Sequence, residues 1–148
     1  MITKLATYIM RTEFFDRASE PGYNKYSELA DHFRRIISKG TSLRDDINVF
    51  LFLHTDTEEA DGSIVGYKVA TVGKLLDKMY NPLESVSITL VALPKYSEDG
   101  VPQYGFYTHR CKVNGIEIPA KTPAEMFEED FIPNDLQYVI NKMNEYYG

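Results

Sequence analysis

The sequence predicts an α/β fold in which helices flank one mixed sheet of about four to five strands. A nearly continuous apolar run, Ile47–Leu53, lies between charged segments, and this pattern is typical of a strand that is covered on both faces. Residues near 86–112 hold two strand-like segments around a turn and predict an antiparallel hairpin. Apolar residues recur at helical spacing in four segments, at about 3–18, 25–39, 71–80 and 135–147.

The two N-terminal helices follow from the spacing of their apolar residues. In the first, Met10 and Phe14 belong to a row with a spacing of four, and a Pro-Gly pair at 21–22 ends the segment. In the second, Asn24 is the expected N-cap and Gly40 the expected C-terminal cap of an amphipathic helix. Both helices are expected to pack an apolar face against the sheet.

The end of the apolar run is the first candidate site. In open α/β sheets, ligands bind at the carboxyl ends of the strands, which is where His54 and Thr55 stand. A structural histidine that bonds a neighbouring backbone is the alternative for His54. Residues 55–63 are expected to form a solvated acidic loop that ends in Asp61-Gly62, because they lack the ligand spacing of a calcium loop.

Short strands and turns are expected to alternate in the C-terminal half. The pattern predicts an extended piece at 64–69 and a strand at 85–93. Asp99-Gly100 is the expected reversal of the hairpin, and a second Asn/Asp-Gly signal follows at 114–115. The stretch 119–130 is expected to be irregular or to hold a short helix, and Asn134 is expected to cap the last helix.

Length and composition bound the class of protein. A chain of 148 residues, 43% hydrophobic and 26% charged, is expected to form one domain, 1–148, with a substantial core. The net charge of −6 argues against broad nucleic-acid binding, which needs clustered Lys and Arg. A single cysteine, the lack of a long apolar run and the lack of a signal-peptide pattern predict a cytoplasmic protein without a membrane segment.

Motifs for nucleotide and metal chemistry are incomplete. The nearest approach to a phosphate-binding loop runs from Gly66 to Lys74, but six residues separate its glycines and no Ser or Thr follows the lysine. The three histidines have no metal-ligand spacing, and the lone Cys111 excludes a cysteine-based zinc site. We therefore expect no catalytic residue, metal or cofactor; the alternative is an enzyme that uses His54 and the acidic loop.

Aromatic and basic residues interleave between Tyr104 and Lys112. Tyr107 and Arg110 are candidate binding residues there, because aromatic rings and cations together can hold single-stranded nucleic acid. A hairpin that serves packing is the alternative, and we favour it over a nucleic-acid platform.

Several short motifs occur in an order that resembles a known family. They are Tyr8–Phe14, Gly22–Tyr26, Ser42–Asp46, Phe52–Thr55, Thr71–Asp77, Ala120–Phe127 and Ile132–Leu136. Together they resemble the C-terminal half of the RecA-like (AAA-type) ATPases carried by bacteriophages and prophages. The resemblance spans nearly the whole chain, and it implies a truncated RecA-like sheet in a protein of the bacterial host cell.

The resemblance also implies that the nucleotide machinery is missing. The family's P-loop precedes the matched region, and the acidic pair of its Walker B strand corresponds to Lys4-Leu5 here. A lysine cannot help hold Mg²⁺, so ATP chemistry is not expected. His54 and Thr55 match the family's strand-end polar pair, and Lys74 and Lys121 match positions that reach a neighbouring subunit's nucleotide.

A truncated RecA-like core implies an exposed strand edge and uncovered helix faces. The N-terminal helix, a second copy or another protein could cover them. We therefore predict a non-catalytic, phage-derived protein-binding module, for example an inhibitor of a host defence nuclease, in the manner of an anti-CRISPR protein, or of a full-length ATPase. The alternative is a nucleic-acid-binding accessory protein of phage recombination that uses residues 104–112 and Lys121.

Overall fold

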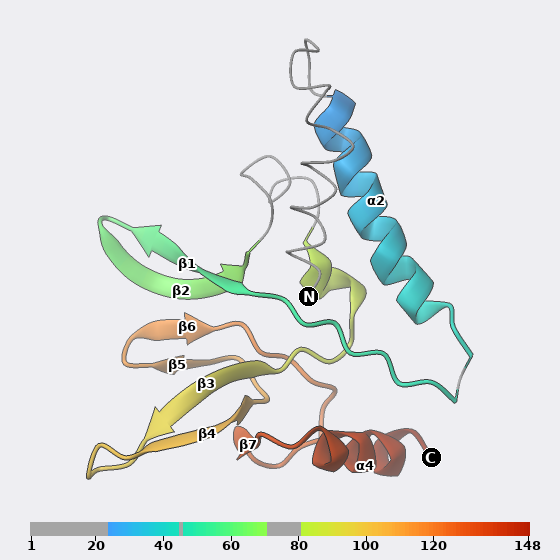
Figure 1. Ribbon diagram of the computed structural model, residues 1–148. Coiled ribbons are helices and arrows are strands. Elements are labelled where there is room, and N and C mark those ends of the chain that lie inside the picture. Colours follow the sequence, from blue (N-terminus) through green and yellow to red (C-terminus); the bar gives the residue numbers. More distant parts are fainter. Residues whose placement is uncertain (1–23, 45, 71–80) are drawn as a thin grey trace. The chain divides into compact units, whose positions relative to one another are not determined.

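The fold is mixed α/β, as predicted, with two helices and two sheets among the described residues (Figure 1). The computed structural model describes residues 24–44, 46–70 and 81–148. The helices expected at 3–18 and 71–80, and the candidate Lys74, lie outside these ranges. The chain divides into two compact units: unit 1 lies within 1–56 and 69–85, and unit 2 comprises 57–68 and 86–148. The expectation of a single domain stays a prediction.

Helix α2 (Asn24–Thr41) is the main regular element described in unit 1. Its buried side chains Ala30, Phe33 and Ile37 recur at spacings of three and four, so one face of the helix is apolar, as the periodicity predicted. Gly40 lies inside the helix and does not follow it, so the predicted C-terminal cap is wrong. The expected helix at 25–39 is therefore confirmed, and it is slightly longer.

The apolar run Ile47–Leu53 forms no strand, which is the main departure from the predicted fold. The side chains of Ile47, Val49 and Phe52 are 45%, 42% and 56% exposed. No strand among the described residues lies beside this run, and a strand owes its stability to the neighbours that pair with it. Apolar composition alone therefore did not make one, and two sheets replace the single sheet that was expected around this run.

The first sheet has the strand order β1-β2-β6-β5. Its β1–β2 hairpin corrects the sequence prediction of an acidic loop at 55–63: Asp61 and Gly62, with φ of 51° and 76°, form a two-residue turn between the strands. Charged residues misled the prediction, because they occupy exposed positions of a strand at the edge of the sheet. The strands are β1 (Thr55–Ala60), β2 (Ser63–Val69), β5 (Cys111–Val113) and β6 (Ile116–Ile118).

The second sheet is antiparallel, with the order β3-β4-β7. Its strands are β3 (Val91–Tyr96), β4 (Pro102–Tyr107) and β7 (Phe131–Pro133), so the hairpin predicted near 86–112 is confirmed. The first strand begins at Val91 and not at 85, because a 3₁₀ turn (η1, Pro82–Ser85) precedes it and Thr89 makes only an isolated bridge to Lys121.

Gly105 lets β7 approach β4 closely. A Cβ atom at this position would lie 2.4 Å from the carbonyl oxygen of Ile132 and 2.5 Å from Cζ of Phe131. Real Cβ atoms essentially never come so close to a backbone atom, so only glycine fits here without a shift of β7.

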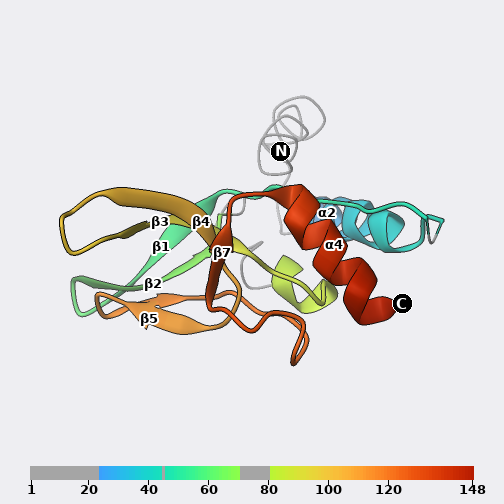
Figure 2. The same cartoon turned by 90° about the horizontal axis from the view of Figure 1, so that it is seen from below.

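The core of unit 2 draws side chains from both sheets, and Figure 2 shows β3 and β4 of the second sheet on one side of β5 of the first. Val91 and Tyr107 come from the second sheet and Ile118 from the first, and all are at most 6% exposed. Side chains from β2 and β5 pack against this cluster. The second sheet is thus fixed on one face, and the same face fixes the orientation of the β3–β4 hairpin.

Helix α4 (Leu136–Tyr147) confirms the helix expected at 135–147. Its N-cap is Asp135, whose carboxylate accepts from the backbone N–H groups of Gln137 (2.8 Å) and Tyr138 (3.4 Å). The predicted cap, Asn134, is one residue too early. Neither helix in the described part of the chain combines the length and apolar character needed to cross a membrane.

The stretch 119–130 is irregular, as one of the two expectations had it. A turn closed by the N–H of Met126 and the carbonyl of Pro123 (3.3 Å) places Glu125 at a φ of 66°. The turn directs Met126 and Phe127 into the interior, where each is 3% exposed.

Candidate functional site

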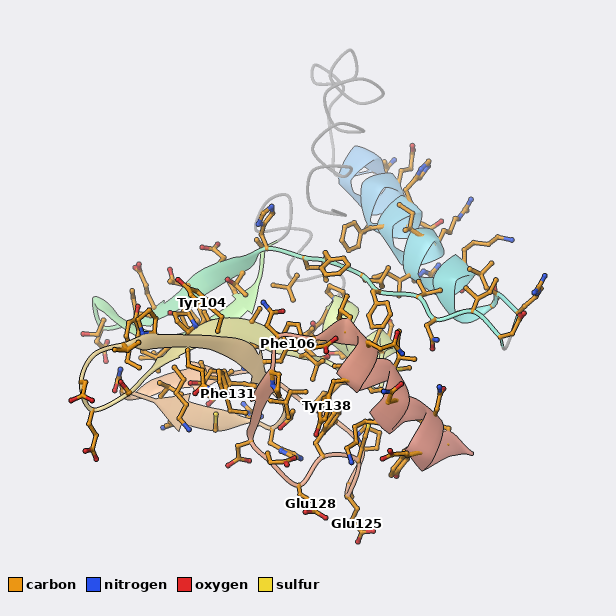
Figure 3. The ribbon with its side chains drawn as sticks, turned by 60° about the horizontal axis from the view of Figure 1, so that its bottom comes forward. Tyr104, Phe106, Glu125, Glu128, Phe131 and Tyr138 are labelled. Carbon is orange, nitrogen blue, oxygen red and sulfur yellow. The ribbon has the colours of Figure 1, made fainter. Side chains whose placement is uncertain are left out.

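Two strongly exposed tyrosines of unit 2 lie on one face of the β3–β4 hairpin. Cross-strand partners and alternate residues share a face, so the register Pro94↔Tyr104 and Tyr96↔Pro102 places these four side chains together. Tyr96 and Tyr104 are 63% and 68% exposed, and Figure 3 shows Tyr104 toward the free end of the hairpin, with Phe106 nearer to α4. We call Pro94, Tyr96, Pro102 and Tyr104 the Tyr–Pro platform.

The turn beyond the platform is fixed by hydrogen bonds. The backbone N–H of Ser97 donates to the carbonyl of Val101 (3.0 Å), and the N–H of Gly100 donates to the carbonyl of Ser97 (2.9 Å). The Ser97 hydroxyl accepts from the N–H of Val101 (3.2 Å). Glu98 and Asp99 lie inside this turn and are exposed, so two acidic residues follow the platform strand β3 on a backbone that the turn fixes.

The opposite face of the hairpin holds its only basic residue. The Nζ atom of Lys95 lies 5.6 Å from the centroid of the Phe131 ring, within the range of a cation–π contact. The Phe131 ring also meets Tyr107 edge-to-face, with 5.0 Å between centroids. The face that bears the platform therefore has no cation from the hairpin itself, whereas the turn supplies two anions.

The acidic excess of the chain is concentrated in unit 2. This unit holds twelve acidic and six basic residues, whereas the remaining residues hold ten of each. The formal net charge of −6 is thus the charge of the unit that bears the platform. An acidic body attracts cationic partners and repels nucleic acid.

A second polar constellation surrounds His109. Its Nδ1 lies 2.9 Å from Oγ1 of Thr108 and 3.3 Å from a carboxylate oxygen of Asp130. Its Nε2 lies 3.4 Å from Oγ1 of Thr122. Thr108 is fully buried, and its hydroxyl donates to the carbonyl of Glu129 (2.5 Å).

These contacts fix the tautomer of neutral His109. The only proton of the Thr108 hydroxyl is used in its bond to Glu129, so this oxygen accepts from Nδ1–H of His109. The Nε2 lone pair is then left to face Thr122, an arrangement seen in general bases. However, Asp130 is 77% exposed and the contact to Thr122 is long, so the imidazole is not held as a general base would be. We therefore interpret the network as a structural contact that connects the end of β4 with the start of β7.

Burial keeps two nearby groups in their neutral forms. The pKa of the Cys111 thiol is raised by burial and, secondarily, by Asp130. The pKa of Tyr107 is raised by burial and, secondarily, by Cys111. Because a thiol is a far weaker nucleophile than a thiolate, the environment of Cys111 suits packing better than covalent chemistry.

The candidate residues predicted from the sequence fall into both units. His54 and Thr55 belong to unit 1: His54 is exposed, and its carbonyl accepts from the N–H of Ala70 (2.8 Å), while Thr55 begins β1. In unit 2, Tyr107 is 4% exposed and part of the core. Arg110 donates from Nε to Glu117 (2.8 Å) on the neighbouring strand.

Lys121 completes the set of described candidates. Its side chain is exposed, and its backbone bonds to Thr89 in both directions (2.7 and 2.9 Å). Within the described ranges, no three His, Cys, Asp or Glu side chains come together in a way that could hold a metal ion.

Sequence reasoning missed three of the four platform residues. It named Tyr104 only as one aromatic of a packing hairpin, and it did not single out Tyr96. It expected a turn from Pro94 to Pro102, but Pro94 lies in β3 and Pro102 in β4. A signal was present, because all four lie within five residues of the predicted reversal at Asp99-Gly100. The part of a hairpin nearest its turn extends beyond the core, so aromatic residues there are expected to be exposed.

Three comparisons with known proteins gave no match. No family model matches the sequence, no curated protein matches it, and no solved structure matches the fold.

Proposed function

We propose that this chain is a non-catalytic protein-binding module that contacts its partner through the Tyr–Pro platform. The observation that carries the proposal is the exposure of Tyr96 and Tyr104, 63% and 68%, on a hairpin whose backbone is held by a ladder of six residue pairs and a closed turn. Tyrosine is enriched among the residues that dominate binding energy, because its ring offers a large contact area with little loss of conformational freedom. Rings held on a rigid hairpin lose even less.

The charge distribution favours a protein partner over nucleic acid. Single-strand platforms combine stacked aromatic rings with cations that follow the phosphates. Here the turn next to the rings carries Glu98 and Asp99, and Lys95 lies on the other face over Phe131. A phosphate backbone laid on the platform would meet repulsion, so the nucleic-acid accessory role is the less favoured alternative.

An inhibitor is the form of this function that we favour. The proposed origin, a remnant of a phage RecA-like ATPase, stays a prediction that rests on the sequence motifs. A partner with a basic surface suits the acidic excess of unit 2. A host defence nuclease or a full-length ATPase, both of which bind polyanions, would offer such a surface.

Site-specific photo-crosslinking tests the proposal. A benzoylphenylalanine replaces Tyr104 in one variant and Tyr147 in the control, which is also exposed, at 60%. In a bacterial lysate, we expect the probe at 104 to yield a discrete protein adduct that excess unlabelled chain suppresses, whereas the probe at 147 does not. Adducts of equal yield and identity at both positions, or none at 104, contradict the proposal.

Two simple measurements test the alternatives. Fluorescence anisotropy with single- and double-stranded oligonucleotides at low salt is expected to show no binding at micromolar protein, and saturable binding there would favour the nucleic-acid role. Light scattering is expected to report a monomer, since two acidic units repel each other. A stable dimer would instead support the sequence-based expectation of a homodimer.

A further inference from the structure

The platform and the turn beside it point to a particular kind of ligand. We infer that they bind an extended, proline-containing peptide segment that carries an arginine or lysine side chain. This inference rests on the proposed function and narrows it, because it commits the binding module to a short linear segment of its partner.

The size of the platform argues for a short segment. A stable interface between two folded proteins uses about 20–30 residues on each side. The platform consists of four side chains, and the turn that follows adds two carboxylates. A surface this small has the size of the contact that a few residues of extended peptide make. Such a peptide binds more tightly when it is already ordered in its free state, because it then loses less conformational entropy on binding.

The residue types argue for proline in that segment. Tyr96 and Tyr104 stand at diagonal positions across the two strands, and diagonal neighbours are separated by about 7–8 Å. Pro94 and Pro102 occupy the other diagonal, and their side chains are smaller than the two rings. Aromatic side chains with such gaps receive the ridges of a polyproline II helix, which is preformed and loses little entropy on binding.

Hydrogen-bonding capacity gives the same answer. The two platform prolines have no backbone N–H, and the side-chain donors of the platform are the two phenol hydroxyl groups. A polyproline II segment leaves its backbone carbonyls unpaired and accepts such bonds. A β-strand ligand would instead need a row of donors and acceptors along the edge of β3, where Pro94 removes one donor.

The turn argues for a basic side chain. Glu98 and Asp99 lie at a position set by the Ser97 hydrogen bonds to Gly100 and Val101. Their charges are not offset by the hairpin's single cation, because Lys95 sits over Phe131 on the other face. An arginine or lysine next to the prolines would pair with them, whereas a second copy of this acidic chain or a phosphate backbone would be repelled.

Peptide titration tests the inference. The probe is a fluorescein-labelled ten-residue peptide with two prolines at Pro-x-x-Pro spacing and one arginine, titrated with the full chain by anisotropy. We expect saturable binding that weakens about tenfold when alanines replace both prolines and about tenfold when glutamate replaces the arginine. Binding is also expected to weaken as salt concentration rises.

Matched variants locate the binding surface. Tyr96→Ser combined with Tyr104→Ser is expected to abolish detectable binding, and Glu98→Gln combined with Asp99→Asn to weaken it about fivefold. The control, Glu128→Gln combined with Glu129→Gln, removes the same amount of charge from another exposed part of unit 2 and is expected to change binding less than twofold.

Three results overturn the inference. The first is the absence of saturable binding at millimolar protein, and the second is equal binding of the peptide in which alanines replace the prolines. The third is an equal effect of the two double substitutions that remove charge, one in the turn and one at residues 128 and 129. A specific photo-adduct at Tyr104 together with no peptide binding would leave the protein-binding function standing and refute only the ligand class. Failure of both measurements would refute both.

Discussion

Two tyrosines of the same strand have opposite surroundings. Tyr107, at the base of the β3–β4 hairpin, is 4% exposed and meets the Phe131 ring edge-to-face. Tyr104, three residues nearer the turn, is 68% exposed. The comparison teaches that this hairpin has two functions along its length: its base stabilises unit 2, and its free end offers apolar surface that stability does not require.

The largest effect is expected at the base. Tyr107→Ala removes a buried ring and leaves a cavity, so we expect a loss of about 4 kcal/mol in the free energy of unfolding, measured by urea denaturation. Tyr104→Ala is the matched control and should cost less than about 0.5 kcal/mol. Similar losses for both variants would show that the free end also stabilises the fold, and they would contradict the assignment of different functions to the two ends of the hairpin.

A somewhat smaller loss is expected where the base meets β7. Gly105→Ala places a methyl group 2.4 Å from the Ile132 carbonyl oxygen, and the resulting displacement of β7 should cost about 3 kcal/mol. Gln103→Ala, two residues away and exposed, should change the free energy of unfolding by less than about 0.5 kcal/mol. A neutral Gly105→Ala variant would mean that β7 can retreat without loss.

The buried hydroxyl after β4 gives the next effect. Thr108→Val keeps the shape but leaves the Glu129 carbonyl without its hydroxyl donor and removes the nearer of two acceptors of Nδ1–H of His109, so we expect a loss of about 2 kcal/mol. Thr122→Val removes only a 3.4 Å contact on the other side of the imidazole and should cost less than about 0.5 kcal/mol. Thermal unfolding of the two variants in parallel checks the order, and the reverse order would refute the proposed tautomer of His109.

The smallest effect is expected from the cation on the inner face. Lys95→Gln removes the charge over the Phe131 ring and should cost about 0.5 kcal/mol. Lys112→Gln is the control, since this exposed lysine has no such ring contact in the described part of the chain. If peptide binding strengthens in Lys95→Gln but not in the control, the charge of Lys95 reaches the platform despite its position on the other face.

Elements with strong local signals could be predicted from the sequence. The apolar stripe of α2, the face of α4 and the reversal at Asp99-Gly100 all depend on residues close together in the chain. The run Ile47–Leu53 could not be judged in this way, because a strand needs partners that lie far away in sequence. The acidic strand β1 was missed for a related reason. Its charged side chains face solvent, and the sequence alone does not show which residues of a strand face solvent.

The candidate site was predictable only in part. Aromatic residues in the hairpin drew attention, but the choice of Tyr104 over Tyr107 as a binding residue required knowledge of which end of the hairpin meets the core. That knowledge depends on Phe131, a residue of β7 that lies far from the hairpin in sequence and packs against Gly105 in the structure. The pairing of Arg110 with Glu117 likewise depends on the β5–β6 register, which places Glu117 beside Lys112.

Pro94 has a consequence for the behaviour of the protein at high concentration. It lies in β3, at the edge of its three-stranded sheet among the described residues, where it withholds one amide hydrogen from any incoming chain. Growth of a fibril along this edge would lose a hydrogen bond at every added layer. The protein can thus accumulate with two aromatic rings in contact with water and still resist amyloid-like self-assembly through that strand.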